Sequence, residues 1–223
     1  MMSTVQSQSG HEDLILRLIA DLKPVQRLPS PPRRALLWLA MVVALAVMLA
    51  AVADRTAALA RITAAPDMWL SACGAALTTV LAAIAAFELS LPDRSRRWAL
   101  LPLPAALLWL GASGAGCLRG WLVPGVHPAN LNDTKDCIAF ILALSVPLSV
   151  LLIGMLRRGH TLWPELTAAT AGFAVAAAAA TLLVLFHPYD ASATDVVVHV
   201  VAVALVIMAN RSFGGRLLQT AGA

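Results

Sequence analysis

Apolar residues fall into long runs separated by short polar segments along most of this chain. Five runs with few or no charged residues are long enough to cross ~30 Å of hydrocarbon, at 35–53, 68–87, 98–118, 137–156 and 166–186. A sixth, at about 191–209, contains "VVVHVVAVALVIMA" and is long enough if it admits Asp195 and His199 near one end. The pattern predicts an all-α membrane protein, a bundle of six transmembrane helices.

The segment before the first run has a different pattern, "HEDLILRLIADLKPVQRLPSPPRR". Its apolar positions recur at the spacing of one helix face: Leu14, Ile15, Leu18, Ile19 and Leu22. Charged residues such as Arg17 and Asp21 occupy the remaining surface, and Pro24 ends the helix. We therefore predict a short amphipathic helix, over about 12–23, followed by a proline-rich linker.

Such a short helix is marginally stable alone in water, because nucleation is costly and no core receives its apolar stripe. Lipid headgroups could cover the stripe, as they do for helices lying in the membrane interface. However, helices of that kind are usually rich in Lys and Arg, whereas this one carries three acidic residues. The proline-rich linker could also hold it away from the bilayer. From these residues alone, a protein groove and a lipid surface both remain open.

Composition agrees with a membrane protein. Sixty per cent of the residues are apolar and the mean hydropathy is +0.80, against about 45–50% apolar residues in soluble domains. We expect no cleavable signal peptide, because a polar segment precedes a first run of full spanning length. The net charge of +4 is spread over short segments between apolar runs, which indicates membrane topology and no direct contact with nucleic acid.

Lysine and arginine residues favour one orientation. Twelve lie in the N-terminal tail, the segments at 88–97 and 157–165 and the C-terminal tail, and four lie in the alternate segments. By the positive-inside rule, both termini are expected in the cytoplasm of a bacterial inner-membrane protein. The predicted organisation is a cytoplasmic tail at 1–34, a six-helix domain at 35–209 and a cytoplasmic C-terminal tail at 210–223.

Several local features predict ordinary bundle packing. Tryptophans near the span ends are typical of an interfacial belt: Trp38, Trp69, Trp98, Trp121 and Trp163. Pro104 and Pro147 lie within spans, where they could kink helices. The small residues of "GASGAG" at 111–116 permit close helix contact.

Thiol, imidazole and carboxylate groups gather on the predicted periplasmic side. Asp195 and His199 are four residues apart and so share a helix face, and ionisable groups within a span need partners. We predict an input site from groups on three helix ends and one loop: Cys137, His187, Asp195, His199 and His127. Cys137, His187 and His199 suit a soft metal such as copper or zinc, and a reactive thiol could instead sense oxidants. The alternative is packing, with Cys73 and Cys117 as small buried side chains.

An enzyme is not expected, because neither a serine–histidine pair, paired carboxylates nor HExxH lies on a plausible common face. A small metal or solute transporter is a better alternative function than an enzyme. Transporters usually place polar or broken-helix features near the membrane midplane, whereas the first, fourth and fifth spans here have apolar centres.

The order of features resembles the NrsF family of six-span membrane anti-sigma factors. The resemblance lies in "DLILRLIADLKPVQRLPSPPRRALLWLA", in "CIAFILALSVPLSVLLIGMLRRGHTLWPELTAATAGFAVAAAAATLLVLFHP" and in "GGRLLQ" near the C-terminus. It implies that an extracytoplasmic-function sigma factor of the sigma-F type is the partner, bound in the cytoplasm by the tail helix. The expected contact residues are Leu14, Ile15, Leu18, Ile19, Asp21 and Leu22. The family pattern has a second cysteine just after the fifth span, where this chain has His187.

Overall fold

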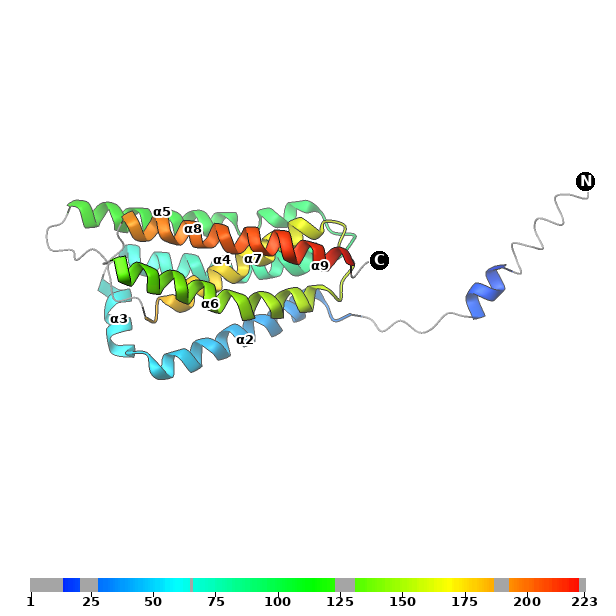
Figure 1. Ribbon diagram of the computed structural model, residues 1–223, viewed down its shortest axis with the longest axis horizontal. Helices are drawn as coiled ribbons and strands as arrows, with labels where there is room; N and C mark the ends of the chain where they lie inside the picture. Colours follow the sequence, from blue (N-terminus) through cyan, green and yellow to red (C-terminus); the bar gives the residue numbers. More distant parts are fainter. Residues whose placement is uncertain (1–13, 21–27, 65, 123–130, 187–192, 221–223) are drawn as a thin grey trace, which may run out of the picture.

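The described part of the chain is helical, as its sequence predicts. The structure is a computed structural model and describes residues 14–20, 28–64, 66–122, 131–186 and 193–220. Residues 14–20 form a short helix ahead of the bundle (Figure 1). The longer helices are α2 (Pro31–Val52), α4 (Pro66–Leu89), α5 (Leu103–Leu122), α6 (Leu131–Leu156), α7 (Pro164–Leu183) and α8 (Ala193–Ala209).

Shorter elements join or extend these helices. They are α3 (Arg55–Ala64), the 3₁₀ turn η1 (Arg96–Leu100), the π-helical turn η2 (Asn210–Gly214) and α9 (Gly215–Thr220). Among the described residues, six helical stretches are long and apolar enough to cross a membrane. The last stretch runs from Val196 to Gln219, so it continues beyond the end predicted at residue 209.

Helix α7 lies at the centre of the bundle, packed against α4, α6 and α8. Fourteen of its 20 residues are buried. Alanine fills most of the buried positions, and small side chains let helix backbones approach closely. At Gly172 an added Cβ would lie 2.8 Å from Cβ of Asn210 and 3.0 Å from Cα of Ile207. The small-residue run of the fifth predicted span therefore serves helix packing.

The outer helices bury few residues. Helix α2 buries only Arg34, Ala35, Trp38 and Val42 among its 22 residues, while leucine, valine and methionine side chains cover the rest of its surface. Apolar side chains on the outside of a bundle are stable where hydrocarbon replaces water. Figure 1 shows the start of α2 and helix α9 at the same end of the bundle.

Three local expectations need correction. Trp38 is fully buried and its indole N–H donates to the Leu148 carbonyl at 3.4 Å, so it belongs to the core and not to an interfacial belt. Pro104 lies in the first turn of α5, where a missing N–H costs no helical bond. The close approach of α4 and α5 occurs at Gly74, where an added Cβ would lie 2.8 Å from the Trp109 backbone nitrogen, whereas Gly111 has open space.

Candidate functional site: the two ends of the bundle

The short N-terminal helix presents apolar side chains that the described chain leaves uncovered. Leu14, Ile15, Leu18 and Ile19 are each more than half exposed, and the helix is drawn in blue in Figure 1. Asp21 and Leu22, the remaining predicted contact residues, lie outside the described residues. Exposed leucine and isoleucine on a helix this short favour a partner that covers them.

Arg34 anchors the first membrane helix where the tail joins the bundle. Its side chain is buried, and its Nη1 donates to the Ser90 hydroxyl at 3.4 Å. Its Nη2 donates to the carbonyl oxygen of Met155 in the last turn of α6, where main-chain carbonyls have no partner within the helix. The guanidinium also lies 5.0 Å from the ring centre of Phe87. One residue of α2 thus contacts the ends of both α4 and α6.

The loop between α6 and α7 packs on the end of α4. The carbonyl of Leu89 accepts hydrogen bonds from the hydroxyls of Thr161 at 2.7 Å and Thr167 at 3.2 Å. An added Cβ at Gly159 would lie 2.6 Å from the Ser90 carbonyl oxygen, so this position requires glycine. The "LRRG" segment therefore supports the same end of α4 that Arg34 contacts.

Ion pairs and a ring contact surround this end of the bundle. Arg94 pairs with Glu88 at 3.0 Å, and Arg96 lies 3.3 Å from the ring centre of Trp163. Arg211, in the π-helical turn, pairs with Glu165 at the start of α7 at 3.1 Å. The Arg211–Glu165 pair is exposed, and such pairs contribute little stability individually, whereas Glu88 is buried. Together these contacts connect the segments that follow α4 and α6 with η2 and the start of α7.

The opposite end contains the residues of the predicted input site, and the structure describes only part of it. His127 and His187 lie outside the described residues, and the side chain of Asp195 is likewise outside them. Cys137 is buried with Ile141, Ala179 and Leu183. Within the described residues, three or more metal-binding side chains do not come together. Of the other cysteines, Cys73 is exposed and Cys117 is partly exposed, so the expectation that Cys73 is buried is wrong.

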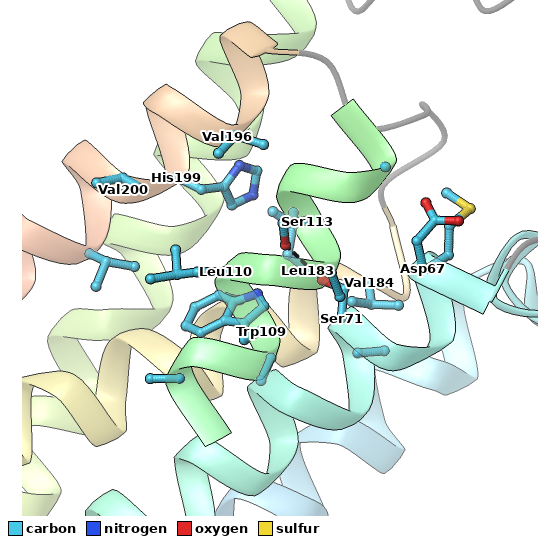
Figure 2. Close-up of a pocket in the computed structure, with 18 of the residues that line it drawn as sticks. Asp67, Ser71, Trp109, Leu110, Ser113, Leu183, Val184, Val196, His199 and Val200 are labelled. Atoms are coloured by element: carbon cyan, nitrogen blue, oxygen red, sulfur yellow. Dashed lines mark hydrogen bonds between the residues drawn. The ribbon is translucent and has the colours of Figure 1, made fainter. Parts of the chain in front are cut away.

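His199 lies on a cavity of about 410 Å³ bounded by α4, α5, α7 and α8. Figure 2 shows His199 and Trp109 around the same space, close to the hydroxyls of Ser71 and Ser113, which share a hydrogen bond of 2.9 Å. Leu183 lines this cavity and also packs beside Cys137. The cavity could not be predicted from the sequence, because its walls come from four separate helices.

Comparison with protein families finds one match over nearly the whole chain. The model of the family NrsF, negative regulator of sigma F, matches residues 18–219. Searches of curated proteins and of solved structures found no match. The matched range begins within the short helix, at residue 18, and includes the Arg34 contacts and all six apolar helices.

Proposed function

Because the chain belongs to the NrsF family, negative regulators of sigma F, we propose that its tail helix holds the sigma factor at the membrane. The family assigns it negative regulation of a sigma factor, which is therefore its partner. The single observation that carries the proposed mode of binding is the uncovered apolar side chains of residues 14–20. The sigma factor is of the extracytoplasmic-function type, and both termini of the regulator lie in the cytoplasm of a bacterial inner-membrane protein.

The chemistry of the tail helix suits a protein groove. An amphipathic helix binds a groove through residues at i, i+3, i+4 and i+7, the spacing of Ile15, Leu18, Ile19 and Leu22. The predicted anchors Leu14, Leu18 and Leu22 are four residues apart on the same face. Each leucine that becomes buried contributes roughly 1.5–3 kcal/mol. At helical spacing, the sequence puts Asp21 next to this stripe, and we expect its carboxylate to pair with a basic residue of the partner.

Release of the sigma factor begins at the opposite end of the bundle. Cys137, His187, Asp195 and His199, with His127 as a further ligand, form the proposed periplasmic input site. Thiolate and imidazole ligands suit copper or zinc, and the thiol of Cys137 is the group that an oxidant would modify. A ligand there shifts the protein between states by its difference in affinity for them.

The test uses the full-length protein in membranes and two leucines of the same helix. Leu18 lies on the predicted stripe, whereas Leu16 lies ~130° from the stripe centre at 100° per residue, and both are exposed. We expect Leu18→Asp to abolish co-purification of the sigma factor and to switch on its target genes. Leu16→Asp is the matched control and should leave both nearly unchanged.

Equal effects of the two substitutions at normal protein abundance would contradict the assignment of the binding face. Retention of the sigma factor by both variants would show that the tail helix is not the binding segment. Transport of a metal ion or solute into proteoliposomes, without sigma-factor binding, would instead favour a transporter.

A further inference from the structure

We infer that the cavity bounded by α4, α5, α7 and α8 is a binding site for one acyl chain, together with the ester carbonyl, of a phospholipid from the leaflet opposite the tail. The volume of about 410 Å³ falls in the range of small-molecule pockets, ~300–1,000 Å³. For comparison, an apolar cavity of ~150 Å³ can hold benzene. The site thus has room for a chain, and this inference goes beyond the capture of a sigma factor.

The length of the cavity matches one leaflet. Its lining runs from Asp67 to Ala75 on α4 and from Val196 to Ile207 on α8. At 1.5 Å per residue these stretches are ~12 Å and ~17 Å long, and half of a hydrocarbon core is ~15 Å. The cavity therefore extends from one membrane surface to about the midplane, which is the depth that an acyl chain occupies.

Polarity changes along the cavity in the same direction as along a lipid. The polar groups lie near the start of α4 and α8, where Ser71 meets Ser113 and His199 lies close by (Figure 2). Toward the midplane the lining is apolar, with Ala75, Phe173 and Ile207. A lipid entering from this surface would place its ester carbonyl beside the hydroxyls and its chain beside the apolar residues.

Hydrogen-bonding capacity remains at the polar end. Ser71 and Ser113 share one hydrogen bond, which uses one hydroxyl proton and leaves the other available to an acceptor. In the described part of the chain, no further bond from this pair is found. An ester carbonyl is an acceptor without a donor, so it complements the remaining O–H group. Since Leu110 and Val200 are lining residues that are also exposed, the chain can enter between α5 and α8.

The test is native mass spectrometry of the full-length protein after reconstitution in a mixture of phosphatidylethanolamine and phosphatidylglycerol and graded removal of lipid. We expect one phospholipid per chain to resist removal. Ala204→Phe and Ala72→Phe place a ring in the cavity from α8 and α4, and each should lower retention at least tenfold. Ala143→Phe, at an exposed position of α6 away from the cavity, is the matched control and should retain the lipid.

A double substitution, Ser71→Ala with Ser113→Ala, removes the hydroxyls with little change in shape. It should lower retention several-fold and keeps the test decisive if the phenylalanine variants fail to fold, which size-exclusion chromatography would reveal. Equal retention by all variants, or by none including the unmodified protein, would overturn the proposal. A retained mass other than that of a phospholipid, or that of a second protein chain, would also overturn it.

Discussion

Arg34 offers a direct test of how the tail is joined to the bundle. The perturbation is Arg34→Met, which keeps a long side chain but removes the donors to Ser90 and Met155 and the contact with Phe87. The matched control is Arg33→Met, because Arg33 is adjacent and exposed. Both substitutions remove one positive charge from the N-terminal segment, so any effect on membrane orientation is the same.

The magnitude follows from the contacts. A hydrogen bond from a charged donor contributes ~1.5–3 kcal/mol, and a cation–π contact adds ~0.5–2 kcal/mol. Burial of the guanidinium costs several kcal/mol and offsets much of this gain. We therefore expect Arg34→Met to weaken docking of the start of α2 by about 1–3 kcal/mol, which corresponds to roughly 5- to 150-fold.

The assay is a reporter driven by a promoter that the captured sigma factor recognises, with the membrane abundance of each variant measured in the same cells. Arg34→Met should raise reporter expression because the start of α2, to which the tail is joined, loses its contacts with α4 and α6, and Arg33→Met should not. An unchanged reporter for Arg34→Met at normal abundance would refute this reasoning. An equal rise for both variants would assign the effect to charge and not to the buried contacts.

Three further predictions concern other parts of the molecule. Gly159→Ala should destabilise the protein by about 1–3 kcal/mol, because the added methyl group meets the Ser90 carbonyl oxygen. Gly154 has open space around it, so Gly154→Ala should leave the unfolding temperature unchanged or slightly raised. Equal shifts in unfolding temperature for the two variants would contradict this prediction. Cys137→Ser should abolish induction of the sigma regulon by copper, zinc, cadmium or oxidants, whereas Cys73→Ser should not; an unchanged response at normal abundance would exclude Cys137 as a sensor. Reporter fusions after Arg97, Arg158 and Ala223 should give a cytoplasmic signal, and fusions after Pro128 and Ala191 should give a periplasmic signal. A cytoplasmic signal at residue 191 would contradict the proposed topology.

The six apolar helices could be predicted from sequence because crossing hydrocarbon is a local requirement of length and composition. Arg34 was predictable only as one of several positive charges, since its burial depends on partners 56 and 121 residues away. Trp38 lies near a predicted span end, yet it is buried because Leu148 of α6 packs beside it. The stripe on the tail helix could be predicted because its residues are neighbours in sequence, whereas the cavity beside His199 needs four helices to exist.

Helix α4 connects the cavity that His199 lines with the Arg34 contact at the other end of the bundle. It carries Ser71 at the cavity and, just beyond its last residue, Ser90 at the Arg34 contact, ~29 Å apart along a continuous helix. Helix shifts of ~1–2 Å accompany many switching transitions, and a shift of that size is enough to break the 3.4 Å bond from Arg34 to Ser90. Sites this far apart normally combine additively within ~0.5 kcal/mol. The test is therefore the free energy of sigma-factor binding, measured for full-length proteins with Ser71→Ala, Ser90→Ala and both substitutions. The effect of the double substitution should differ from the sum of the single effects by more than ~0.5 kcal/mol. Strict additivity would exclude α4 as the connecting element.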